Sequence, residues 1–189
     1  MTTKLATQKI RQRGFTLMEV LVATMVLLAG IVAVAQLVPV AVTANNGNRR
    51  DSSATVIAQR ALAQFMQLPL TFTGTFSDPV LNSICSVGSV GSGGCGLGDA
   101  TQPGVTVGSP VVIMANRPAI NFAAGKVASY NATVTDPEDP FGAQYDVRWA
   151  VITGGNGTAA SSRRFIIAAR QVNVNSYTLP LTLDAMVQR

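Results

Sequence analysis

The feature that most limits how this chain can fold is an uncharged, largely apolar stretch from Val20 to Val42. Its 23 residues reach about 34 Å as an α-helix, which is enough to cross the hydrocarbon core of a bilayer. Four basic residues precede the stretch, and none follows it until Arg49. By the positive-inside rule, this asymmetry predicts a cytoplasmic N-terminus and an exported remainder. We therefore expect a single membrane anchor.

A short motif at the start of this segment carries a resemblance to a known family. The basic leader ends at Gly14, Phe15 opens the apolar segment, and Glu19 is the one carboxylate within it. With Thr16 and Leu17, these residues resemble the processing site of type IV prepilins and type II secretion pseudopilins. The resemblance implies that prepilin peptidase cuts after Gly14 and methylates Phe15, and that Glu19 acts in assembly.

Two alternative roles for the N-terminal segment remain open. Ala33-Val34-Ala35 has the small-residue pattern of an ordinary signal-peptide cleavage site, although apolar residues continue to Val42. A plain single-pass anchor, with Glu19 as an incidental charge, is the second alternative. The N-terminal residue of the mature protein distinguishes all three.

Apolar residues continue at helical spacing beyond the anchor. The stripe consists of Ala54, Ile57, Ala58, Ala61, Leu62, Phe65 and Met66. Pro69 ends this pattern, so residues 15 to 68 are predicted to form one long helix whose second half covers a sheet. Pro39 predicts a kink near residues 35 to 38, and Asn45–Asn48 predicts a bend or frayed joint.

The C-terminal third has the pattern of antiparallel strands. Large apolar residues alternate strictly from Tyr145 to Val151, with Asp146 and Arg148 on the other face and Trp149 in the core. Residues 154–157 predict a turn, and further strands are expected at 127–135, 163–170 and 179–187. We expect an α+β fold in which an antiparallel sheet shields the helical stripe.

These elements predict four regions along the chain. They are a leader at 1–14, a transmembrane and assembly helix at 15–42, its amphipathic continuation at 43–68, and a periplasmic globular domain at 69–189.

The two cysteines, Cys85 and Cys95, lie in a Gly- and Ser-rich stretch of this exported domain. An oxidising compartment favours a disulfide that closes the loop between them, contributing about 2–3 kcal/mol. We expect the bridge to tie down residues 80 to 100 only, since the helical stripe does not include them. Two thiols without a histidine do not complete a tetrahedral metal site.

The composition argues against catalysis and against nucleic-acid binding. Histidine is absent, which removes the triads and metal sites that depend on imidazole, and we expect no cofactor and no catalytic residues. Removing the leader leaves ten basic residues against nine acidic ones, so the mature chain lacks the excess of positive charge that nucleic-acid-binding proteins carry. Whether the acidic turn of Asp136, Glu138 and Asp139 binds calcium stays open, and no metal site is predicted there.

Within the family, residues 14–23, residues 50–59 and the helix end at Phe65-Met66 resemble PilV-type minor pilins, although minor pseudopilins share much of this pattern. The resemblance implies a structural subunit and not an enzyme. It also implies three kinds of partner: prepilin peptidase, the inner-membrane assembly machinery, and other major and minor pilins that contact its N-terminal helix. The implied location is the inner membrane, then a surface pilus or a periplasmic pseudopilus.

Overall fold

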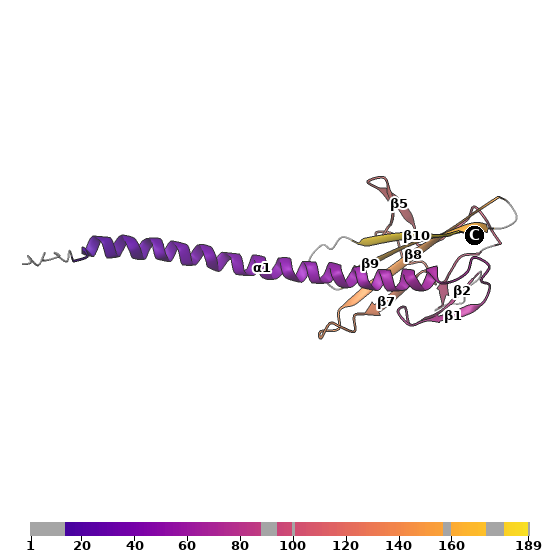
Figure 1. Cartoon of the computed structure of the whole chain (residues 1–189), viewed down its shortest axis with the longest axis horizontal. Coiled ribbons are helices and arrows are strands. Elements are labelled where there is room, and N and C mark those ends of the chain that lie inside the picture. Colours follow the sequence, from indigo (N-terminus) through magenta and orange to yellow (C-terminus); the bar gives the residue numbers. More distant parts are fainter. Residues whose placement is uncertain (1–13, 88–93, 100, 157–159, 173–179, 189) are drawn as a thin grey trace, which may run out of the picture. The chain divides into compact units, whose positions relative to one another are not determined.

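The computed structural model describes residues 14–87, 94–99, 101–156, 160–172 and 180–188. These residues contain one helix, α1 (Leu17–Met66), and ten strands (Figure 1). The strands are β1 (Thr75–Asp78), β2 (Ser83–Ser86), β3 (Cys95–Gly96), β4 (Thr106–Gly108), β5 (Val111–Met114), β6 (Arg117–Ile120), β7 (Asn131–Thr135), β8 (Gln144–Gly155), β9 (Ala160–Gln171) and β10 (Leu181–Gln188). The chain divides into two compact units, Met1–Gly47 and Asn48–Arg189.

In the first unit, α1 is long and apolar enough to cross a membrane, and its most apolar window has a mean hydropathy of 2.5 with none of it buried. The helix continues through Pro39 and through Asn45–Asn48, so the frayed joint expected at the asparagines is wrong. Nearby, the Thr43 hydroxyl donates to the carbonyls of Pro39 and Val40, at 3.0 and 2.9 Å. The helix was expected over residues 15 to 68, and it is two residues shorter at each end, from Leu17 to Met66.

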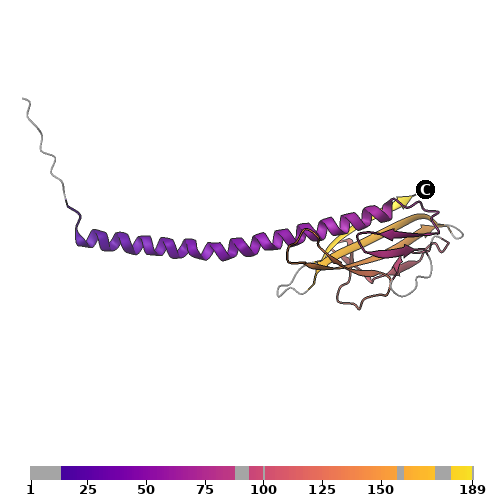
Figure 2. The ribbon, with the colours of Figure 1, turned by 90° about the horizontal axis from the view of Figure 1, so that it is seen from below.

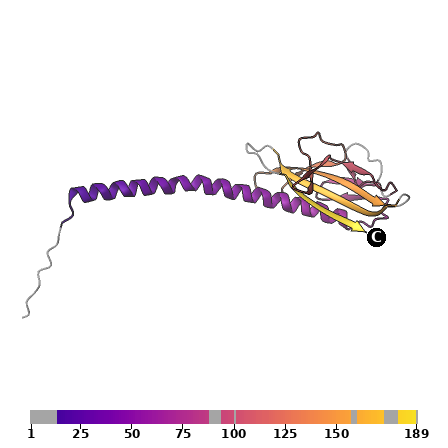
Figure 3. The same cartoon turned by 90° about the horizontal axis from the view of Figure 1, so that it is seen from above.

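In the second unit, the end of α1 packs on one face of an antiparallel sheet, as predicted (Figures 2 and 3). The sheet has the order β10-β9-β8-β4, and β7 also pairs with β8. Phe65 of the stripe meets Trp149 of β8 and Phe165 of β9, with ring centroids 5.8 and 5.3 Å apart. The predicted α+β fold, with its helical stripe and the central position of Trp149, is confirmed.

The opposite face of the sheet is also covered. Asp146 and Arg148 lie there as predicted, yet both are buried. Ile120 and Phe122 pack over this face, in a second core with Ala150, Ile166 and Ala168. Arg148 donates from Nε and Nη2 to Asp146 Oδ2, at 3.1 and 3.0 Å, so the buried charges neutralise each other.

The strands expected at 127–135, 163–170 and 179–187 correspond to β7, β9 and β10, with shifted ends. Of the turn predicted at 154–157, Gly154 and Gly155 still belong to β8, and residues 157–159 lie outside the described residues. The stretch from 69 to 110, which carried no strand prediction, contributes β1 to β4.

Candidate processing and assembly site

The scissile bond implied by the leader lies just before the helix. Gly14, Phe15 and Thr16 have no helical backbone, and α1 begins at Leu17. Gly14 is exposed, a side chain placed on it meets no atom within 4 Å, and the Phe15 side chain is 84% exposed. The Gly14–Phe15 bond is therefore accessible and non-helical in this chain.

Thr16 and Glu19 cap the start of α1 with a reciprocal set of hydrogen bonds. The amide and hydroxyl of Thr16 donate to Glu19 Oε2, both at 3.3 Å. The Glu19 amide donates back to the Thr16 hydroxyl oxygen, also at 3.3 Å. This is a capping box, which satisfies amides that have no partner within the helix. The Thr-x-x-Glu signature at 16–19 is the sequence signal for such a cap, although no capping role was predicted for Thr16.

The surface that follows this site is apolar and exposed along the whole first unit. Large side chains exposed there include Leu17, Met18, Leu21, Val22, Met25, Leu28 and Ile31. Soluble proteins rarely expose so extensive an apolar surface. Lipid, or the apolar helices of other subunits, are the surroundings that suit it.

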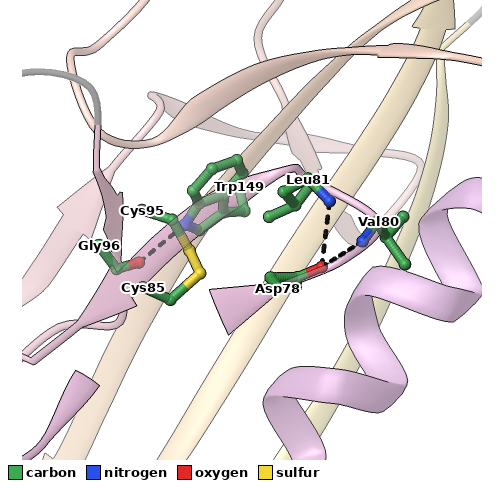
Figure 4. Close-up of a disulfide and its surroundings, with 7 residues drawn as sticks. All are labelled: Asp78, Val80, Leu81, Cys85, Cys95, Gly96 and Trp149. Atoms are coloured by element: carbon green, nitrogen blue, oxygen red, sulfur yellow. Dashed lines mark hydrogen bonds between the residues drawn. A yellow bond between two sulfur atoms is a disulfide. The ribbon is translucent and has the colours of Figure 1, made fainter. Parts of the chain in front are cut away.

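The predicted disulfide between Cys85 and Cys95 is confirmed. The bridge joins β2 to β3, which pair in parallel with these two residues in register, and both cysteines are fully buried. Beside it, Trp149 Nε1 donates to the Gly96 carbonyl at 2.8 Å (Figure 4). A Cβ on Gly96 would lie 2.4 Å from the ring of Tyr130, so that ring would have to shift to admit a larger residue.

The expectation that this loop lies outside the core is wrong. Cys85, Cys95 and Leu97 belong to the same buried cluster as Ile57 and Phe65 of the helix. The bridged segment therefore packs together with the stripe of α1 in one core. The disulfide thus stabilises the main core and not only a surface loop.

Asp78 stands next to this bridge and has an unusual environment (Figure 4). Its side chain is fully buried, and Oδ1 accepts the amides of Val80 and Leu81 at 2.8 and 3.0 Å. Oδ2 is buried without a hydrogen-bond partner among the described residues. Burial raises the pKa of this carboxyl above its ordinary value of 3.8, and the two amide bonds offset only part of that effect.

Asp78→Asn is expected to stabilise the second unit by about 1 kcal/mol near neutral pH. Asparagine keeps the acceptor for both amides and removes the buried charge. Because the folded-state pKa is raised, the wild type loses stability as pH rises from 3.8 through that pKa. Thermal unfolding of both proteins should show a higher midpoint temperature for Asp78→Asn at neutral pH, and this difference should disappear below pH 3.8. Asp184→Asn, on an exposed carboxylate paired with Arg164, is the control with little effect. Lower stability of Asp78→Asn at every pH would contradict the prediction.

The acidic turn at 136–142 does not gather its carboxylates around one point. Asp136 Oδ1 accepts the Glu138 amide at 2.9 Å, and Asp139 accepts the amides of Phe141 and Ala143 at 3.3 and 3.1 Å. Among the described residues no group of three His, Cys, Asp or Glu could hold a metal ion. These carboxylates shape the turn, and their geometry carries no argument for calcium.

Comparison with known proteins adds one match. The prokaryotic N-terminal methylation motif covers residues 9–35, which include the Gly14–Phe15 bond, the capping box and the start of α1. No curated protein and no solved structure matches the chain. The motif implies processing by prepilin peptidase and pilus-type assembly. With this prepilin leader, its methylation motif and a long N-terminal helix whose end packs on an antiparallel sheet, the chain is a type IV pilin-like protein.

Proposed function

We propose that the protein is a minor pilin, a structural and priming subunit of a type IV pilus. One observation carries this proposal: the methylation motif runs directly into a helix whose apolar side chains are exposed over the whole first unit. Such a helix serves first as a membrane anchor and then as the part that packs among other subunits. The likeness of residues 14–23 and 50–59 to PilV-type minor pilins favours a minor over a major subunit.

The proposed life of the chain has two stages. Residues 1–14 are the leader, residues 15–42 anchor the chain in the inner membrane, residues 43–68 continue the helix, and residues 69–189 fold in the periplasm. Prepilin peptidase then removes the leader, and the inner-membrane assembly machinery inserts the subunit into a fibre beside other major and minor pilins. No catalytic role and no cofactor are part of this proposal.

A minor pseudopilin of a type II secretion system is the second candidate. It is favoured by the same motif, because both classes use an N-terminal apolar helix for anchoring and assembly. Shearing separates the two, since a pilin is recovered from surface fibres whereas a pseudopilin stays in the periplasm. A singly anchored or secreted binding domain is a third and weaker candidate.

The mature protein is expected to begin with N-methylated Phe15. The reason is the exposed, non-helical Gly14–Phe15 bond, which is accessible to a peptidase in the membrane. Intact-protein mass spectrometry of the membrane fraction measures this end directly. Gly14→Glu should leave the full-length precursor, because it places a charged side chain beside the scissile bond.

Ala33→Leu is the matched control, because it removes a small residue of the alternative signal-peptide site without adding a charge to the apolar stretch or touching Gly14. It should leave cleavage after Gly14 intact. A mature chain that begins at Gln36, or an uncut Met1, would contradict the proposed function.

A further inference from the structure

Phe141 is the most exposed large apolar side chain among the described residues, with an exposed fraction of 91%. It lies in the turn between β7 and β8, where Pro140 and Gly142 flank it. Single apolar residues are common on protein surfaces, so exposure alone gives this ring no role. Its place at one end of the second unit is what distinguishes it.

The β7–β8 turn lies beside the first helical residues of the second unit. Arg49 Nη2 is 3.8 Å from Asp139 Oδ1, and Phe141 follows two residues after that carboxylate. Directly after the turn, the Tyr145 hydroxyl donates to the Arg50 carbonyl at 3.4 Å. Phe141 therefore stands at the end of this unit that the chain enters from the apolar segment.

The chain between the apolar segment and this end is short. Val42, the last residue of the uncharged stretch, precedes Arg49 by seven residues. Seven residues rise about 10 Å in an α-helix and span at most about 25 Å when fully extended. The headgroup layer adds roughly 5–8 Å on each side of the hydrocarbon core. A bilayer that holds the apolar segment is thus within reach of the turn.

The backbone of the turn suits a surface where water is scarce. Every amide in residues 138–143 donates to an oxygen of Asp136 or Asp139, and Pro140 has no amide. Unpaired amides are costly at a lipid surface, because no carbonyl or water replaces the lost partner. This turn can therefore lie against lipid without leaving a backbone donor unpaired.

The charges around Phe141 are balanced. Arg49 pairs with Asp139, and Arg60 pairs with Glu138 at 3.4 Å. Because positive charge is not in excess, attraction to anionic lipids does not account for a contact with the bilayer. The apolar ring has to supply it, and aromatic side chains favour the boundary between lipid and water.

We propose that Phe141 lies among the lipid headgroups while the subunit is anchored, so that the β7–β8 turn holds the second unit against the membrane surface. The inference rests on the proposed anchoring of residues 15–42. Because the anchor makes the contact intramolecular, even a weak contact is populated. It belongs to the subunit that waits in the membrane, and it breaks when the subunit enters a fibre.

Tryptophan quenching by lipid tests this contact. Phe141→Trp keeps an aromatic ring, and the only native tryptophan, Trp149, is fully buried. The full chain is placed in phosphatidylcholine vesicles whose lipids carry a doxyl group near the headgroups. Their quenching of Phe141→Trp should exceed that of the wild type at least about twofold, because aromatic rings favour this depth.

Met186→Trp is the matched control, an exposed apolar position at the other end of the sheet. Met186 aligns with Arg164 of β9, and Arg164 aligns with Ile152 of β8. Ile152 lies eight residues beyond the start of β8, which is about 26 Å along the strand. Quenching of this variant should not exceed that of the wild type.

A second variant tests the native ring, since an added tryptophan itself favours the interface. Pro137→Trp, at an exposed position on the same turn, should be quenched while Phe141 is present. Adding Phe141→Ser should remove that quenching, whereas adding Ile113→Ser, on the exposed hairpin of β5 and β6, should not.

Three results would each overturn the inference. The first is equal quenching of Phe141→Trp and Met186→Trp, and the second is a blue shift without doxyl quenching, which would place the ring against protein. The third is quenching that needs anionic lipid and disappears in high salt, which would show a contact made by charge.

The proposed function is tested separately, by the mature N-terminus in cells. N-methylated Phe15 together with an unquenched Phe141→Trp would overturn only this contact. Quenching without cleavage after Gly14 would overturn only the proposed function.

Discussion

Replacing both Cys85 and Cys95 by alanine is expected to lower the free energy of unfolding of the second unit by about 3 kcal/mol or more. Loss of the short closed loop accounts for most of this value, and the volume left by two fully buried sulfur atoms adds to it. The whole helix-and-sheet core should become less stable, because Cys85 and Cys95 share one buried cluster with Phe65 and Trp149.

Urea unfolding followed by the fluorescence of Trp149, the only tryptophan, measures this loss beside the bridge. Hydrogen exchange shows which part of the unit loses stability. Amides of β8 and β9 should lose protection together with those of β2. Ser161→Ala, at an exposed position on β9, is the control and should unfold like the wild type. If only residues near β2 and β3 lost protection, the bridge would be a local restraint after all.

Loss of the Glu19 charge is expected to reduce incorporation into fibres at least about tenfold, with membrane insertion and cleavage nearly unchanged. A carboxylate at this depth costs a few kcal/mol unless a cation accompanies it, and cleavage creates one, the amine of Phe15. Pairing the two charges between adjacent subunits offsets much of that cost and selects one register of insertion. An intrachain pair is the rival arrangement, since residues 15 and 19 lie one helical turn apart.

The capping box makes the choice of substitution decisive. Glu19→Gln keeps an acceptor for the amide and hydroxyl of Thr16 but removes the charge. Thr16→Val weakens the cap and keeps the charge. If charge guides assembly, sheared fibres should lack the Gln variant and contain the Val variant. The reverse result would show that Glu19 acts through helix capping. Normal incorporation of Glu19→Ala would show that Glu19 has no role in assembly.

Much of this architecture is readable from local patterns. The stripe from Ala54 to Met66 and the alternation from Tyr145 to Val151 each repeat with the period of their own element. The run from Val20 to Val42 is marked instead by its length and by the absence of charge. The long apolar helix, the helical stripe and the central strand were predictable for these reasons.

The region between residues 69 and 126 followed no such pattern. Its strands are short, and the two residues of β3 are held by their parallel pairing with β2 and by the disulfide. At Gly96 the ring of Tyr130, a distant neighbour in the sequence, lies close against the backbone. Contacts of this kind join residues far apart in the chain, so they leave no periodic signal in the sequence.

The sequence by itself determined the long apolar helix, the methylation motif, the helix-on-sheet fold and the availability of the Cys85–Cys95 bridge. Only the tertiary structure decided what covers each face of the sheet. Asp146 and Arg148 alternate with the core residues, as charges on a solvated face would, yet the segment that carries Ile120 and Phe122 buries them. Alternation specifies that two faces differ, but whether the polar face meets water depends on which distant segment packs over it.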